Sequence, residues 1–180
     1  MLRIHALLIV LVCCAFTACN GKIRRVTDVR SEMTRLIQAH RFDEAAQLGL
    51  RSVTGSTSDA PIFYLVSLAY AERAQYDADL RVVSLKQVDD YARKSVSADS
   101  SNQLNRFDVA WVLEYAASID AGTQCQFYRQ SGALYEQISN SLSSAANTTE
   151  ANVSGSDRLR NEAAKGKSRV HKKQADADCQ

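Results

Sequence analysis

The stretch PIFYLVSLAYAERA, residues 61–74, decides the fold class of this chain. Its apolar residues recur three and four positions apart, which places them along one face of an α-helix. They are Ile62, Leu65, Val66, Ala69 and Tyr70, with Phe63, Ser67 and Ala74 widening the same stripe. Pro61 suits the first turn of a helix, where its missing N–H removes no internal hydrogen bond. The stretch therefore predicts an amphipathic helix that must bury its apolar face against other helices.

The same spacing recurs on both sides of this segment. Five further stripes cover residues 26–37, 42–53, 85–96, 104–115 and 128–142. Strict apolar–polar alternation is absent, and a chain with one proline and seven glycines lacks the many turns of an all-β fold. Six amphipathic helices with mostly short connections indicate antiparallel neighbours. We therefore expect an all-α domain over residues 26–142.

Three segments resemble the tetratricopeptide repeat, a helical pair that recurs about every 34 residues. HRFDEAA, residues 40–46, is similar to the turn and second-helix start of that repeat. Residues 61–74 are similar to a first helix, and YARKSVSADSS, residues 91–101, is similar to a repeat end. Ser67 and Ser95 stand where the repeat has small residues. The resemblance implies antiparallel hairpins stacked as a short TPR-like solenoid, and an unrelated helical bundle is the alternative.

In the tetratricopeptide family, the first helices of successive pairs line a groove that holds peptides or partner helices. The resemblance implies that the groove of this chain is lined by Arg30, Thr34, Gln38, Tyr64, Leu68 and Glu72. The alternative for Tyr64 and Leu68 is the hydrophobic core, where large apolar side chains are most often buried. Trp111, on the stripe of the fifth helix, has the same two interpretations.

The start of the chain, MLRIHALLIVLVCCAFTAC, has the composition of a secretory leader. Arg3 supplies the positive charge, residues 6–16 form an apolar run, and small residues precede a polar segment. This run is shorter than the about 20 residues that a membrane-spanning helix needs. We therefore expect an exported protein with a signal peptide over residues 1–18 and a tether over residues 19–25.

FTAC, residues 16–19, resembles the lipobox of bacterial lipoproteins, in which Phe16 stands where leucine is usual. The resemblance implies that Cys19 carries acyl chains such as palmitate, and that the protein is a membrane-anchored lipoprotein facing the periplasm. Asn20, as a residue other than aspartate, implies the outer membrane. The alternative is ordinary cleavage after Ala15, which leaves an unacylated chain.

Removal of the leader leaves three cysteines, and an odd number in an exported protein calls for an explanation. Acylation of Cys19 leaves Cys125 and Cys179 in a compartment that permits disulfides. A bond between these two would contribute about 4 kcal/mol by restricting the unfolded chain. The alternative is an ordinary buried cysteine at position 125 and a terminal free thiol at position 179.

From residue 143 the composition changes to a low-complexity linker and a basic tail that extends to residue 180. Because the tail contains Gly166 and shows no stripe of large apolar residues, we expect it to be disordered. Its cations are candidates for contact with a polyanion such as cell wall or anionic lipid head groups. They are Lys165, Lys167, Arg169, Lys172 and Lys173. A solvated end without a binding role is the alternative.

The sequence contains no motif for catalysis, for a cofactor or for a metal. Only His40 and His171 follow the leader, and neither lies in a metal-ligand spacing. A glycine-rich phosphate loop and a Gly-x-Ser-x-Gly elbow are also absent. The net charge of +2 gives no field for nucleic acid. We expect an adaptor that binds a protein or peptide in the cell envelope, and the alternative is a structural lipoprotein whose tail grips the envelope.

Overall fold

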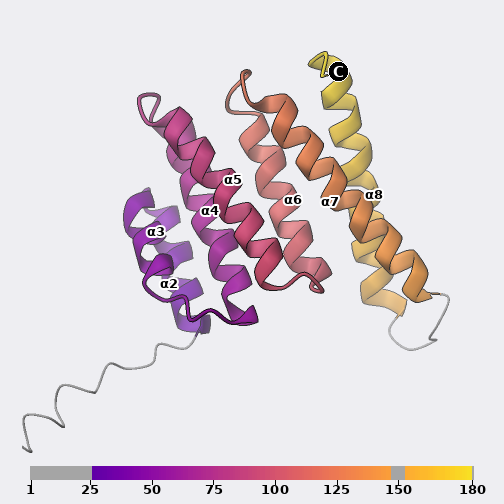
Figure 1. Ribbon diagram of the computed structural model, residues 1–180, viewed down its shortest axis with the longest axis horizontal. Helices are drawn as coiled ribbons and strands as arrows, with labels where there is room; N and C mark the ends of the chain where they lie inside the picture. The colour runs from indigo at the N-terminus through magenta and orange to yellow at the C-terminus, as the bar shows by residue number, and fades with distance from the viewer. Residues whose placement is uncertain (1–25, 147–152, 180) are drawn as a thin grey trace, which may run out of the picture.

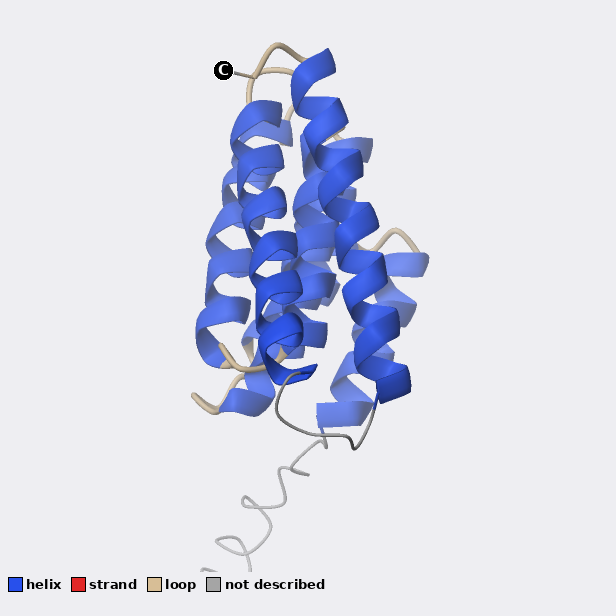
Figure 2. Ribbon diagram, turned by 90° about the vertical axis from the view of Figure 1, so that its right-hand side faces the viewer, coloured by secondary structure: helices blue, strands red, loops and turns tan. Residues whose placement is uncertain are grey.

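The computed structural model describes residues 26–146 and 153–179, and these contain helices and no strand (Figure 2). The predicted signal peptide, Cys19 and the predicted tether lie outside these residues. The elements are α2 (Val26–Gln38), α3 (Phe42–Leu50), a 3₁₀ turn (Thr57–Asp59), α4 (Ala60–Tyr76), α5 (Arg81–Ala98), α6 (Gln103–Ala117), α7 (Gln124–Ala146) and α8 (Val153–Asp176). The prediction of an all-α fold is confirmed, with seven α-helices in the described part of the chain where six were expected.

The helices run up and down in sequence and form two layers (Figure 1). Hairpins α2–α3, α4–α5 and α6–α7 pack side by side, and α8 follows as a last single helix that packs on α7 and α6. The first helices α2, α4 and α6 contact one another in turn, and α8 continues their row beside α6. We call this row the first-helix layer. The opposite layer consists of α3, α5 and α7, which lie nearer the viewer in Figure 1.

The turn between α2 and α3 depends on His40, whose φ of 56° lies in the left-handed region. That conformation lets the His40 N–H donate to Ile37 O and the Arg41 N–H donate to Leu36 O, so that the last carbonyls of α2 are paired. The His40 ring also packs edge-to-face with the rings of Phe42 and Tyr76. The turn therefore both ends α2 and fixes the start of α3 against the far end of α4.

Buried serines hold the hairpins together where their helices cross. Ser67 of α4 donates to the Val88 carbonyl of α5 at 3.1 Å, and Ser95 of α5 donates to the Ala60 carbonyl at 2.7 Å. Ser131 of α7 donates to a carbonyl of α6 in the same way. A small side chain lets two backbones approach, and its hydroxyl pairs a buried oxygen. The small residues predicted at positions 67 and 95 are thus fully buried at helix crossings.

The core consists of two clusters that meet at α4. One joins α2, α3 and α4 around Met33 and Val66, and the other joins α4 to α8 around Leu85 and Tyr135. Gly49 sits in the first cluster, where a Cβ would lie 2.7 Å from atoms of both Met33 and Val66. Close packing of α3 between α2 and α4 therefore requires glycine at this position.

The C-terminal segment corrects the sequence-based expectation. The sequence predicts a low-complexity linker from residue 143 and a disordered basic tail, yet α7 extends to Ala146 and Val153–Asp176 forms the helix α8. The part of the predicted linker at residues 147–152 lies outside the described residues. The buried residues Ala163 and Val170 of α8 belong to the core. At Gly166, a Cβ would lie 2.6 Å from Cζ of Tyr135, so glycine permits α8 to lie directly on α7. The residue that suggested disorder is a close-packing position.

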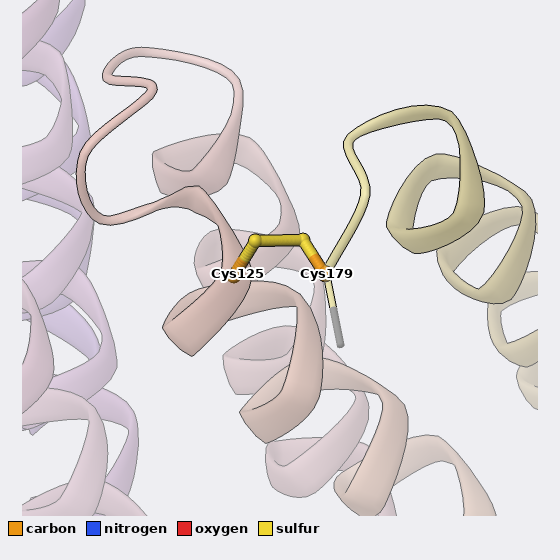
Figure 3. Close-up of a disulfide and its surroundings, with 2 residues drawn as sticks. All are labelled: Cys125 and Cys179. Atoms are coloured by element: carbon orange, nitrogen blue, oxygen red, sulfur yellow. A yellow bond between two sulfur atoms is a disulfide. The ribbon is translucent and has the colours of Figure 1, made fainter.

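A disulfide fastens the end of α8 to the start of α7 (Figure 3). Cys125 in the first turn of α7 and Cys179 after α8 are joined with an S–S distance of 2.01 Å and a Cα–Cα distance of 5.3 Å. The bond thus links α7 and α8 covalently in addition to their packing. The structure therefore contains the bond that the first of the two interpretations of these cysteines proposes.

Candidate functional site

The six residues proposed for a groove lie on the first-helix layer. Arg30, Thr34 and Gln38 are exposed on α2. Tyr64 and Leu68 of α4 are partly buried and touch both core clusters, so each of the two interpretations describes part of their environment. Their remaining surface, with that of the partly exposed Glu72, faces solvent. The first-helix layer thus presents a strip of polar side chains on α2 beside a strip of apolar and charged side chains on α4.

Three helices meet around Tyr64. Burial and the nearby charge of Asp108 raise the pKa of Tyr64 to about 12, while Arg30 acts in the opposite direction. Burial also raises the pKa of Asp108, again opposed by Arg30. One residue each from α2, α4 and α6 therefore lies within electrostatic reach of the others. Asp108 was not among the sequence-based candidates.

A second group lies further along the same layer, between α4 and α6. Tyr115 of α6 interacts with Glu72 of α4, and burial together with the charge of Glu72 raises the pKa of Tyr115 to about 12. Trp111 stacks on Tyr115 with ring centroids 5.9 Å apart and an angle of 17° between the planes. The indole remains 44% exposed. The structure thus places Trp111 at the surface rather than in the core.

A cleft of about 430 Å³ continues this surface from α6 to α8. Its α6 wall is aromatic, and its α8 wall is charged. The lining residues are Phe107, Trp111, Glu114, Tyr115, Ser118, Glu162, Arg169 and Lys173. Such a volume accommodates one or two side chains of a bound partner.

Glu114 forms the floor of this cleft and is the most deeply placed carboxylate in it, with its side chain 6% exposed. Arg169 donates to both of its oxygens at 2.7 Å, and Lys173 donates at 3.0 Å. Burial alone would raise the pKa of Glu114, but these hydrogen bonds outweigh it and the pKa is lowered. The ion pairs therefore hold α8 against α6 and fix the charged wall of the cleft.

The basic residues of α8 are mostly engaged with carboxylates of the same chain. Lys165 pairs with Glu162 and Lys167 with Glu136, in addition to the two cations on Glu114. Lys172 is exposed on α8. Four of the five residues proposed to contact a polyanion thus neutralise charges of the fold itself.

Sequence reasoning missed Asp108, Glu114 and Tyr115 as residues of this surface. A signal was present, since Asp108, Trp111 and Tyr115 are three and four positions apart and therefore share one face of α6. The depth of that face could not be read from the sequence, because it depends on where α4 and α8 lie.

The part of the chain that the structure describes contains no group of three or more His, Cys, Asp or Glu side chains suited to a metal. No helix in the same residues is both long enough and apolar enough to cross a bilayer. The chain matches no known protein family, no curated protein and no solved structure.

Proposed function

We propose that this chain is an exported, lipid-anchored adaptor that binds a protein or peptide along its first-helix layer. The observation that carries the proposal is the exposed Trp111 on α6, whose indole stacks on the partly buried ring of Tyr115. Tryptophan and tyrosine offer large, rigid contact areas and dominate the energetics of protein interfaces. A tryptophan held at the surface by a neighbouring ring is ready to be covered by a partner.

The surroundings of Trp111 favour an extended partner with both apolar and polar side chains. The cleft beside it offers an apolar wall on α6 and paired charges on α8. Along the layer, Glu72 and then Arg30 with Asp108 present charges of both signs. A segment that lies across α2, α4, α6 and α8 would meet these features in succession, as the resemblance to tetratricopeptide repeats implies.

The cysteines support the exported location. A bond between Cys125 and Cys179 is stable in oxidising compartments and rare in the cytosol of most cells. When these two are paired, Cys19 is the single remaining cysteine after the predicted leader. Acylation at the lipobox-like segment removes that odd thiol, and this supports the lipid anchor.

The alternative role, a structural lipoprotein whose basic tail grips the envelope, has weaker support. Arg169 and Lys173 hold Glu114, and Lys167 holds Glu136, so a polyanion would have to compete with ion pairs of the fold. We therefore prefer the first-helix layer as the binding surface.

A photo-crosslinking amino acid introduced at single positions of the full chain, expressed in its own cells, tests the adaptor role. Position 111 reports on the first-helix layer, and position 86, an exposed lysine on α5, is the matched control in the opposite layer. We expect a discrete protein adduct from position 111 that weakens when Tyr115 is replaced by alanine. Equal adducts from both positions, or none from position 111, would contradict the proposal.

A further inference from the structure

The opposite layer contains a second cleft, separate from the proposed partner surface. It lies between α5 and α7, which pack on α6 rather than extensively on each other, and α6 forms its floor. Its volume is about 360 Å³, and its surface is mostly apolar. The apolar lining comes from Ala92, Val96, Val109, Leu113, Ala133 and Leu134. This volume is in the range of small-molecule sites.

One end of the cleft is polar and built from Asp89 of α5 and Gln130 of α7. The side chain of Asp89 is only 12% exposed and pairs with Arg93. It also accepts hydrogen bonds from Gln130 Nε2 at 2.9 Å and from Gln126 Nε2 at 3.3 Å. A carboxylate paired with a guanidinium can only accept, so the amide of Gln130 must turn its nitrogen toward Asp89.

This orientation leaves the amide oxygen of Gln130 without a partner. Gln130 Oε1 is buried and accepts no hydrogen bond from any residue that the structure describes. A buried acceptor of this kind is costly when unpaired, and a donor that reaches it recovers the lost interaction. The cleft therefore combines an apolar body with one unused acceptor at its polar end.

From this combination we infer that the α5–α7 cleft binds a small, largely apolar molecule that carries one hydrogen-bond donor. The apolar part fills the space over Val109 and Leu113, and the donor reaches Gln130 Oε1 as the Gln130 amide, now closed to solvent, shifts toward the cleft. A purely apolar ligand would leave the acceptor unpaired, and a strongly polar ligand would lose hydration against the apolar walls. The inference does not depend on the adaptor role, because the two surfaces lie in different layers.

A matched pair of fluorescent probes tests the inference on the full chain with its disulfide intact. N-phenylnaphthylamine is apolar and has a single N–H donor, and its N-methylated form has the same ring system without that donor. We expect saturable binding of the first probe with one site per chain, and about tenfold weaker binding of the second, as for loss of one hydrogen bond to a buried acceptor. The absence of saturable binding, or equal affinities, would overturn the inference.

Two variants locate the site and a third controls for folding. Ala133→Trp places an indole at the exposed side of the cleft and should abolish binding. Gln130→Leu removes the acceptor and should reduce the tenfold difference between the probes to nearly none. Ala175→Trp, at an exposed position of α8, should leave both affinities unchanged. Binding that survives Ala133→Trp, or a probe difference that survives Gln130→Leu, would place the probe elsewhere and refute the proposed site.

Discussion

Replacing Gly166 with alanine tests whether α8 lies directly on α7. An added Cβ would stand 2.6 Å from Cζ and 2.7 Å from Cε1 of Tyr135, closer than two non-bonded carbon atoms can approach. Gly155 is the matched control, because it belongs to the same helix and a Cβ there would meet nothing within 4 Å. The two substitutions make the same chemical change in different surroundings.

The expected magnitudes follow from two opposing effects. Alanine is favoured over glycine by up to about 1 kcal/mol in the interior of a helix, where Gly166 lies, and by less in the first turn, where Gly155 lies. Overpacking a closed contact costs about 1–3 kcal/mol, and only Gly166→Ala incurs it because the Tyr135 ring is fully buried and has little room to move. We therefore expect Gly166→Ala to be less stable than Gly155→Ala by about 2 kcal/mol.

Urea denaturation of the oxidised full chain, followed by circular dichroism, measures this difference. In a Tyr135→Leu background the smaller side chain opens space, so Gly166→Ala should become as favourable as Gly155→Ala. Equal stabilities of the two alanine variants in the wild-type background would refute the packing of α8 on Tyr135. Equal stabilities would instead favour a C-terminal segment that is only loosely attached to α7.

Three further changes probe other parts of the fold. Glu114→Gln should destabilise the protein by about 1–2 kcal/mol at pH 7, because Arg169 and Lys173 lose a buried carboxylate. The pKa of Glu114 is lower in the folded protein than its ordinary value of 4.5. The stabilisation by this carboxylate is therefore present above pH 4.5 and is lost as the pH falls through the folded pKa. The urea curves of the wild type and the variant should accordingly converge in acid. Asp59→Asn should lower the stability by about 2 kcal/mol in the same assay, because the buried carboxylate accepts hydrogen bonds from the N–H groups of residues 54, 55 and 56. An unchanged or increased stability would contradict the role of Asp59 in the loop before α4. Exchange of Cys125 for serine should lower stability by about 4 kcal/mol and speed amide hydrogen exchange in α8 before other helices, whereas uniform acceleration would argue against a local fastening.

Most of the fold could be predicted because it is encoded by large apolar residues at helical spacing. Residues 61–74 illustrate this, since Ile62 and Val66 are fully buried as the stripe requires. The helix α8 was not predicted because its buried stripe consists of Ala163, Gly166 and Val170, which are three and four positions apart but mostly small. Small residues bury little area, so their periodicity is a weak signal unless a neighbour such as Tyr135 is known to fill the space.

The candidate site was predicted only in part, and the reason is the distance along the chain between its members. Tyr64, Leu68 and Glu72 are proposed from the resemblance, which specifies positions within one helix. Glu114 and Arg169 lie 55 residues apart, and nothing local to either predicts their pairing. Such pairs depend on the packing of whole helices, as does the exposure of Trp111.

The intact mass of the mature protein, extracted from the membranes of the cells that make it, tests most directly that this protein is exported and lipid-anchored. The account predicts a chain that begins at an acylated Cys19 and is two hydrogens lighter before reduction than after it, because Cys125 and Cys179 are bonded. An unacylated chain that begins at Phe16, or one that retains its leader and shows no change of mass on reduction, would contradict the account.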